Sequence, residues 1–374
     1  MPPPTATASG APEMVFAPVT NVIMQPTTLC NLDCTYCYLP QRRERLAMAP
    51  GVAKAVARAL AASERVRGPV EIVWHGGEPT AAGLPAMRRL VDAFADLEVV
   101  HVLQTNATLI NQEWIDFIGE HDIKIGVSID GTMSSNASRI DLAGKETWTR
   151  TMRGIERLSE ADIEFSAIAV VRDPDPAGVP EFYEFFASLG CVSLGINIEE
   201  TEGVNTAGRS LHLERTTRFW EAVTAAWDRN PVLEVRELDR VADYLRFRPD
   251  VEDITRQDPI PTVAWNGEVT VLSPELAGYT DPRLGKFASG NILARGFDEI
   301  LDRAAQAPWV REFAAGIAEC ARACEYFAFC GGGQASNKYW EHGCLDITRT
   351  DYCTGAKITL MEGVLAHARH RNPR

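Results

Sequence analysis

The sequence lacks the features of a membrane protein or a nucleic-acid-binding protein. It contains no apolar run of about 18 residues, which is the length that a membrane-spanning helix needs. Residues 1–15 have neither the basic nor the apolar region of a signal peptide, and their composition predicts a disordered tail. Acidic residues are in excess, with a net charge of −14, which argues against a partner bound through its phosphates. We therefore expect a cytoplasmic protein with no membrane or nucleic-acid partner.

The sequence also lacks an internal repeat of the length that builds solenoids or propellers. Instead, short β-branched runs alternate with amphipathic helical stretches, a pattern typical of βα units around a parallel sheet. The predicted strands are Val22–Gln25, Val70–Trp74, Val99–Gln104, Lys124–Ile129, Glu164–Val170 and Val192–Ile198. The predicted helices are Gly51–Arg65, Pro85–Leu97, Gln112–Glu120, Thr147–Ala161 and Val179–Leu189. Because such crossovers are right-handed, we expect an α/β fold with a partial (β/α)6 barrel.

Nine cysteines are present, and in a cytosolic protein disulfides are not expected. Cys30, Cys34 and Cys37 form one set with C-x3-C-x2-C spacing. Three thiolates can hold three irons of a four-iron cube and leave the fourth iron open. A zinc site needs a fourth ligand, and none lies nearby in the sequence. A redox pair of Cys34 and Cys37 leaves Cys30 without a role.

Polar and glycine residues follow the predicted strands, where the active site of a parallel barrel lies. After the first strand comes the cysteine set, and after the second comes His75-Gly76-Gly77-Glu78-Pro79. The second segment alone is compatible with an ordinary turn, because Gly and Pro are common in loops. The remaining strand ends carry the following residues: Gln104, Thr105, Asn106, Ser128, Asp130, Gly131, Arg172, Asn197 and Glu199.

The cysteine spacing, the segment 75–79 and the segment Val127-Ser128-Ile129-Asp130-Gly131 together resemble the radical SAM superfamily. The resemblance implies a 4Fe-4S cluster on Cys30, Cys34 and Cys37, with S-adenosylmethionine (SAM) chelating the open iron. It also implies a set of cofactor-binding residues: Tyr36, Gly76, Gly77, Glu78, Pro79, Gln104, Thr105, Asn106, Ser128, Asp130, Arg139, Asn197 and Glu199. For Arg139 a solvated surface position remains an alternative.

A second cysteine set lies near the C-terminus: Cys320, Cys324, Cys330, Cys344 and Cys353. Four of these thiolates would also satisfy a zinc ion. Next to the first set, the C-x3-C-x5-C-Gly-Gly run resembles the SPASM or twitch-like extension, which binds auxiliary iron-sulfur clusters. A full SPASM domain has about seven cysteines, whereas this chain has none in residues 271–278. We expect at least one auxiliary cluster, with Cys320, Cys324, Cys330 and Cys353 as ligands and Cys344 as a fifth candidate.

The predicted domains are a tail (1–15), a radical SAM barrel (16–225), a linker (226–260) and a C-terminal cluster domain (261–374). The linker is rich in Pro and acidic residues, and a helix is expected over 210–230. Asn266-Gly267 between alternating apolar residues predicts a hairpin over 262–271. Cys191 is expected to be a small buried apolar residue.

The whole pattern, including Ser273-Pro274-Glu275-Leu276 and Tyr352-Cys353, looks like the GrrM-type radical SAM/SPASM peptide maturases. The resemblance implies an enzyme that abstracts a side-chain hydrogen from a ribosomal precursor peptide and forms a cyclophane-type crosslink. It also implies a low-potential electron donor of the flavodoxin or ferredoxin type. Ring closure needs a general base, for which Glu275, Asp281 and Asp346 are candidates, although each is also compatible with a surface or turn carboxylate.

Three alternatives remain open. A thioether-forming maturase would use the same core. A sulfatase-maturase-like enzyme would oxidise Cys or Ser to formylglycine, but it normally has more auxiliary cysteines. The third alternative is a zinc-binding scaffold that recognises peptides without catalysis.

Overall fold

A parallel sheet forms the centre of the computed structural model, which describes residues 13–206, 212–247 and 256–371. Ten strands are hydrogen-bonded in the order β14-β11-β10-β2-β3-β4-β5-β6-β7-β8. The six predicted strands correspond to β2 (Val19–Met24), β3 (Val66–Trp74), β4 (Val99–Thr105), β5 (Lys124–Ser128), β6 (Phe165–Val171) and β7 (Ser193–Ile198). Each pairs in parallel with the next, so the expected α/β fold is confirmed.

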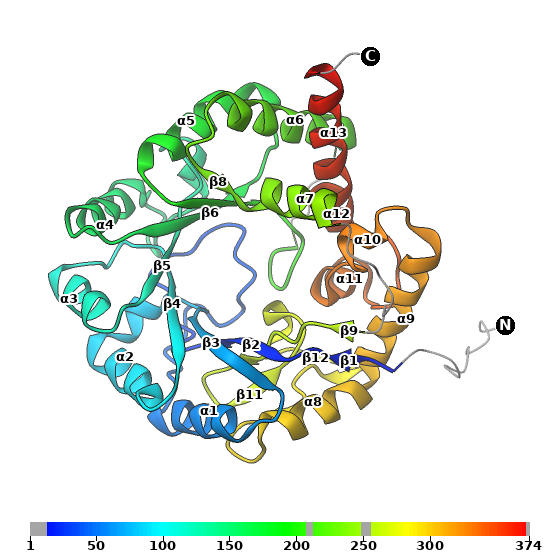
Figure 1. Cartoon of the computed structure of the whole chain (residues 1–374). Coiled ribbons are helices and arrows are strands. Elements are labelled where there is room, and N and C mark those ends of the chain that lie inside the picture. The colour runs from blue at the N-terminus through cyan, green and yellow to red at the C-terminus, as the bar shows by residue number, and fades with distance from the viewer. Residues whose placement is uncertain (1–12, 207–211, 248–255, 372–374) are drawn as a thin grey trace.

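Helices lie on the outside of this curved sheet, which is open on one side (Figure 1). They are α1 (Pro50–Ala62), α2 (Leu84–Val91), α3 (Gln112–Glu120), α4 (Trp148–Glu160), α5 (Val179–Leu189) and α6 (Leu213–Arg229). The helix predicted over 85–97 is interrupted, because a 3-10 turn (Asp92–Phe94) follows α2. The tail residues 1–12 lie outside the described residues.

Alternation along the strands separates an outer face from an inner one, as the two-residue period of a β-strand requires. In β6, Phe165, Ala167, Ala169 and Val171 are buried, whereas the residues between them are only partly buried. Two of those, Ile168 and Val170, line the cavity inside the barrel. The outer side chains therefore belong to the core beneath the helices, and the inner ones face the cavity.

The segment that we predicted to be a linker is largely structured. It contains β8 (Glu234–Val235), which pairs in parallel with β7, and α7 (Arg236–Phe247). The apolar side chains of Val235, Leu238 and Val241 are buried, and this burial holds the segment against the barrel. Residues 248–255 of the predicted linker lie outside the described residues.

The C-terminal part of the chain continues the barrel sheet. β10 (Thr262–Val263) and β11 (Glu268–Thr270) form the predicted hairpin, and β10 also pairs in parallel with β2. β14 (Gly290–Asn291) adds to β11. The sheet thus crosses residue 261, where we placed the start of the C-terminal domain. Two small sheets pair β1 (Val15–Phe16) with β9 (Arg256–Gln257), and β12 (Thr280–Asp281) with β13 (Gly285–Lys286).

Six further helices lie between residues 297 and 371, and those labelled α9, α10 and α11 are on the open side of the barrel (Figure 1). They are α8 (Phe297–Gln306), α9 (Pro308–Ala323), α10 (Phe327–Cys330), α11 (Ala335–His342), α12 (Asp351–Cys353) and α13 (Thr359–Arg371). The last helix packs on α6 so closely that a Cβ on Gly363 would lie 2.6 Å from the Trp220 Cβ. Within the described residues, none of the helices has both the length and the apolar character of a membrane span.

Candidate active site

The first three cysteines lie in a loop that directly follows β2. The Cys30 N–H donates to the Arg42 carbonyl at 2.8 Å, and the Cys37 N–H donates to the Cys34 carbonyl at 3.1 Å. One cavity of about 570 Å³ is lined by all three cysteines. This volume lies in the range of small-molecule binding sites. The predicted triad therefore faces a space large enough for a cofactor.

The chemistry of these thiols suits a metal cluster. Burial raises the pKa of all three thiols, that of Cys34 to about 11, so they hold their protons at neutral pH unless a metal displaces them. Within the described ranges, no group of three or more Cys, His, Asp or Glu side chains is arranged to hold a single metal ion. Three thiols on one cavity wall provide the ligands for three irons of a four-iron cube and leave the fourth iron open.

Gly77 fixes the loop that carries the cysteines. Its φ is +62°, a conformation that favours glycine. A Cβ at this position would lie 2.6 Å from the Leu29 carbonyl oxygen and 2.7 Å from those of Thr27 and Thr28. The backbone of the second rim loop therefore packs directly on the residues that precede Cys30, and a side chain at Gly77 would push the two apart.

Glu78 joins the ends of β3 and β4. Its carboxylate accepts hydrogen bonds from the Thr80 N–H at 3.1 Å, the Thr80 hydroxyl at 2.6 Å, the Thr105 hydroxyl at 2.6 Å and the Asn106 N–H at 2.8 Å. Burial raises its pKa, and these hydrogen bonds oppose the rise. The resemblance placed Glu78 among the cofactor-binding residues. Glu78 does line the cavity, but its carboxylate is held by protein donors that position the rim.

A buried chain of three polar side chains stands behind the cysteine loop. The Tyr36 hydroxyl donates to the Asp130 carboxylate at 2.6 Å, and the Arg139 guanidinium donates to the Tyr36 hydroxyl at 2.6 Å. Arg139 is 8% exposed and lines the cavity, which removes the surface alternative. Its Nε is buried with no hydrogen-bond partner in the described part of the chain. A buried donor of this kind requires an acceptor, so Arg139 fits a ligand such as the SAM carboxylate.

The third and fourth strand ends meet through side chains that line the cavity. The Gln104 amide donates to the Ser128 hydroxyl at 2.9 Å, and Gly126 leaves room for it, because a Cβ there would lie 2.2 Å from Gln104 Oε1. The Asn106 amide donates to the Asn31 side chain at 2.9 Å, which connects β4 to the cysteine loop. These contacts bring the predicted cofactor residues of β4 and β5 together on one wall.

The fifth and sixth strand ends contribute charged pairs. Arg172 forms an ion pair with Glu199 at 2.9 Å, and the Arg236 guanidinium donates to the Asn197 side-chain oxygen at 2.7 Å. Asn197 and Glu199 both line the cavity, as does Thr105. Three of the predicted cofactor residues do not line it, namely Gly76, Pro79 and Asp130. Asp130 instead accepts the hydrogen bond of Tyr36, which lines the cavity. Gly76 packs against Gln25, because a Cβ at Gly76 would lie 2.9 Å from the Gln25 side chain.

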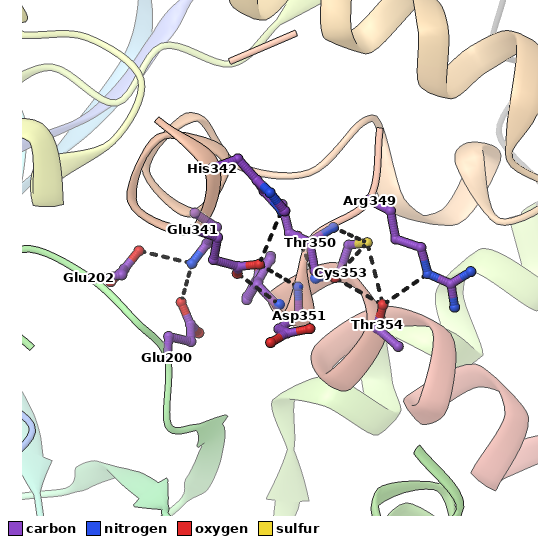
Figure 2. Close-up of polar contacts among 11 residues, drawn as sticks. Glu200, Glu202, Glu341, His342, Arg349, Thr350, Asp351, Cys353 and Thr354 are labelled. Carbon is purple, nitrogen blue, oxygen red and sulfur yellow. Dashed lines mark hydrogen bonds and ion pairs between the residues drawn. The ribbon is translucent and has the colours of Figure 1, made fainter. Parts of the chain in front are cut away.

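Three carboxylates, those of Glu200, Glu202 and Glu275, line the same cavity. The Asn337 side-chain amide donates to Glu200 at 2.6 Å and to Glu202 at 3.0 Å, as Figure 2 shows around the labelled glutamates. Burial raises the pKa of Glu200 to about 8 and that of Glu275 to about 7, and it also raises the pKa of Glu202. The negative charge of Glu275 adds to the rise at Glu200 and Glu202. At neutral pH this group therefore has both proton-accepting and proton-donating members.

We did not assign Glu200 and Glu202 a role from the sequence. The signal was the acidic run at 199–202 after the sixth strand, but β-strand alternation alone does not say which of several adjacent acids faces inward. The other two predicted bases lie elsewhere. Asp281 accepts hydrogen bonds from the Tyr339 hydroxyl at 2.9 Å and the Leu284 N–H at 2.7 Å, and neither Asp281 nor Asp346 lines the cavity.

The second cysteine set surrounds a separate small cavity. Its lining includes the four first-choice ligands from the sequence, Cys320, Cys324, Cys330 and Cys353. Cys344 is half-buried and does not line this cavity. The structure thus groups the four thiols that were expected to share an auxiliary cluster. Cys191 is buried, as expected, and its thiol lies 3.7 Å from the Phe186 carbonyl oxygen.

Backbone donors point at these thiols. Gly331, Gly332 and Gly333 all have positive φ, and the N–H groups of Gly332 and Gly333 lower the pKa of Cys330, although burial, the larger effect, raises it. The Thr350 N–H donates to the Cys353 sulfur at 3.3 Å, which Figure 2 shows. Successive backbone N–H groups in such turns form anion-binding concavities that recur at iron-sulfur sites. The cysteine cavity therefore suits bound thiolates.

The fold and the open cysteine triad define a barrel enzyme that holds a cofactor at the carboxyl edge of its parallel strands. The Radical SAM superfamily model matches residues 24–186. An uncharacterised protein of Synechocystis sp. is 33% identical over 361 residues, which cover 90% of this chain and 89% of that protein. The chain belongs to the radical SAM superfamily. It is therefore an enzyme that uses SAM and a 4Fe-4S cluster, and the non-catalytic zinc scaffold is overturned.

More distant similarities concern maturases. The serine-type anaerobic sulfatase-maturating enzyme of Klebsiella aerogenes is 30% identical over 217 residues, 55% of this chain and 54% of that enzyme. The chain thus matches about half the length of that relative. Native anSMEcpe, solved with bound AdoMet and the Cp18Cys peptide, has a TM-score of 0.74 at 21% identity, covering 95% of this chain and 99% of that one. Streptococcus suis SuiB, solved with its precursor peptide SuiA, has a TM-score of 0.65 at 17% identity, covering 90% and 76%. These two structures share the fold.

Proposed function

We propose that this radical SAM enzyme modifies a ribosomal precursor peptide and joins a side-chain Cβ to a nearby aromatic ring in a cyclophane-type crosslink. One observation carries the proposal. A single cavity extends from the cysteine triad past the carboxylates to Phe329, Tyr352 and Lys357, and Lys357 also lines the C-terminal cysteine cavity. A peptide side chain bound there lies between the radical source, a proton acceptor and an electron acceptor.

When bound, the cluster and SAM supply a 5′-deoxyadenosyl radical, which takes one hydrogen atom from the peptide. The chain's own residues hold the reactants in place. Arg139 offers its unpartnered Nε to a SAM carboxylate, and Tyr36 keeps the guanidinium in position. The inner face of β6 presents Ile168 and Val170 to the cavity. These apolar side chains exclude water and other hydrogen donors from the radical.

Ring closure requires loss of one proton and one electron. The peptide radical forms a C–C bond to a ring carbon, and the ring then gives its proton to a base and its electron to the C-terminal cluster. Glu275 and Glu200 are suited to accept the proton, because they line the cavity and their raised pKa values of about 7 and 8 lie near neutral pH. We assign the electron to a cluster on Cys320, Cys324, Cys330 and Cys353 and, from there, to a flavodoxin- or ferredoxin-type carrier.

The similarities support a peptide substrate without selecting the reaction. SuiB and anSMEcpe, which share this fold, have each been solved with a bound peptide. Formylglycine formation is the second candidate, favoured by the 30% identity to the Klebsiella enzyme. A thioether-forming reaction would use the same cavity. The cyclophane proposal draws on the four-cysteine C-terminal set, which is smaller than that of a full SPASM domain.

The experiment uses anaerobically reconstituted enzyme, SAM and dithionite with two substrates. One is a candidate precursor peptide that contains aromatic residues, and the other is a sulfatase-derived peptide with the target Ser or Cys. A crosslink removes two hydrogen masses, suppresses fragmentation between the joined residues and leaves no aldehyde. A product that reacts with a hydrazide probe would instead establish formylglycine and overturn the crosslinking proposal.

A further inference from the structure

Lys338 is a buried lysine whose amine lies beside the C-terminal cysteines. The side chain, on α11, is 2% exposed. Its Nζ lies 3.9 Å from the Cys320 sulfur and 5.2 Å from the centre of the Phe313 ring. Within the described part of the chain, no carboxylate forms an ion pair with it; burial lowers its pKa, and the nearby thiols and Asp346 oppose that effect. A buried charge without a counter-charge is costly, so the site needs an anion.

The local backbone is built around this side chain. Gly316, on α9, leaves space for the amine, because a Cβ there would lie 2.7 Å from Lys338 Nζ. Gly333 lies on the other side, where a Cβ would be 3.8 Å from Lys338 Cε. Lys338 is therefore held against the cysteine cavity and has little room to reach solvent.

A second lysine lines the same cavity from the other side. Lys357 lies in a π-helical turn (Thr354–Ile358) that directly follows Cys353. Its charge lowers the pKa of Cys330, against the larger effect of burial. Among the described residues, the lining of the barrel cavity contains this same Lys357 as its one lysine, and the cation that acts on Cys34 is Arg139. Two lysine side chains thus line the cavity of the four C-terminal thiols. If these thiols bind a cluster as thiolates, the positive charges of the lysines would partly balance their negative charges.

We propose that Lys338 is the fixed counter-charge of the auxiliary cluster and holds its reduction potential high enough to take an electron from the closing peptide. The inference rests on the proposed function, in which that cluster accepts the electron. A positive charge close to a cluster stabilises the more negative, reduced form. Lys338 acts through the cluster and does not touch the peptide, so it is a positioning residue.

The test isolates the auxiliary cluster in full-length protein whose Cys30, Cys34 and Cys37 are replaced by alanine. In this background we compare Lys338→Met, which removes the charge at similar length, with Lys338→Arg, which keeps it. Lys54→Met on the exposed side of α1 is the matched control. Iron content is measured first, and the potential is then measured by an EPR-monitored redox titration.

We expect Lys338→Met to keep its iron and to lower the reduced-to-oxidised ratio at a fixed potential at least tenfold, which is about 59 mV for a one-electron couple. Lys338→Arg and Lys54→Met should change the reduced-to-oxidised ratio less than twofold. If Lys338→Met loses the cluster while Lys338→Arg keeps it, the counter-charge role is also supported. An unchanged potential in Lys338→Met, loss of iron from both Lys338 variants, or zinc in place of iron overturns the inference. These readouts need no peptide, so they are independent of whether the product is a crosslink or formylglycine.

Discussion

The two cysteine sites differ in what surrounds their thiols. The barrel triad lies on the wall of a large cavity, where Glu78 adds to the larger effect of burial on the pKa of Cys30. Burial also raises the pKa of Cys34, which Arg139 lowers and Asp130 raises. The C-terminal set encloses a small cavity with two lysines and backbone N–H donors. The first site leaves room for a ligand, and the second is closed and compensated by positive charge. In the function that we propose, the first site generates the radical and the second accepts the electron, and this difference in surroundings suits each site to its task.

The largest expected effect separates the two sites directly. Cys34→Ala should lower SAM cleavage under dithionite by roughly a thousandfold or more, because residues that act as one unit fail together. Cys324→Ala should lower that cleavage less than about tenfold while abolishing the peptide product. Both activities are read by chromatography of 5′-deoxyadenosine and mass spectrometry of the peptide. SAM cleavage by Cys34→Ala at the wild-type rate would show that the assignment of the radical cluster is wrong.

The next effect concerns the carboxylates between the sites. If Glu200 and Glu275 accept the ring proton, product formation should rise with pH through about 7 to 8, where these groups ionise. Replacing both by Gln should lower product formation by about a hundredfold and leave 5′-deoxyadenosine formation nearly unchanged. The check is a pair of pH profiles, one for each product. If the double variant loses the peptide product and 5′-deoxyadenosine to the same extent, Glu200 and Glu275 do not act as the base.

The same carboxylates predict how the folded state responds to pH. Burial raises the pKa of Glu200 from 4.5 to about 8, so the folded chain binds more protons than the unfolded chain between these values. The stabilising effect is fully present below the unfolded pKa and is lost as pH rises through the folded pKa. Thermal unfolding of the metal-free protein should therefore occur at lower temperature at pH 8 than at pH 6, and Glu200→Gln should reduce that difference. If the unfolding temperatures of Glu200→Gln at pH 6 and pH 8 differ as much as those of the wild type, Glu200 does not have the raised pKa assigned to it.

A smaller effect tests the packing of the triad loop. Gly77→Ala should destabilise the protein by more than the roughly 1–3 kcal/mol of a strained backbone, because the new Cβ also meets three carbonyl oxygens. Gly83→Ala is the matched control, since Gly83 also has positive φ but nothing lies within 4 Å of a Cβ there. Thermal unfolding and iron content are measured for both. Equal losses in the two variants would show that the close contact has no role beyond backbone strain.

The smallest effect should come from the polar chain behind the triad. Tyr36→Phe removes the hydroxyl between Asp130 and Arg139 and leaves buried groups short of a partner, which costs about 1–3 kcal/mol. We expect SAM to bind roughly tenfold more weakly by anaerobic calorimetry. Tyr183→Phe also loses one hydrogen bond, to the Asn230 carbonyl on the outside of the barrel, and should bind SAM normally. Equal affinities in the two variants would argue against a role for Tyr36.

The parallel barrel was predictable because its signals are local. Each strand from β2 to β7 is a short β-branched run followed by polar or glycine residues, and each connection carries a helical period. The segment over 226–260 was less predictable. Its Pro and acidic residues indicate a linker, whereas the burial of Val235 and Val241 depends on the neighbouring β7 and cannot be recognised from the segment itself.

By itself, the sequence determined the chemistry of this protein. The C-x3-C-x2-C spacing and the glycine pair before Glu78 are local patterns, and covalent order alone keeps such residues close together. Only the tertiary structure decided which distant groups share a space. It placed Glu200 and Glu275 in one cavity, held Glu78 with protein donors, left the Arg139 Nε without a partner, and set Lys338 against Cys320. The physical reason is that these relations depend on side chains meeting across elements far apart in the chain, and the packing of the whole core fixes their distances.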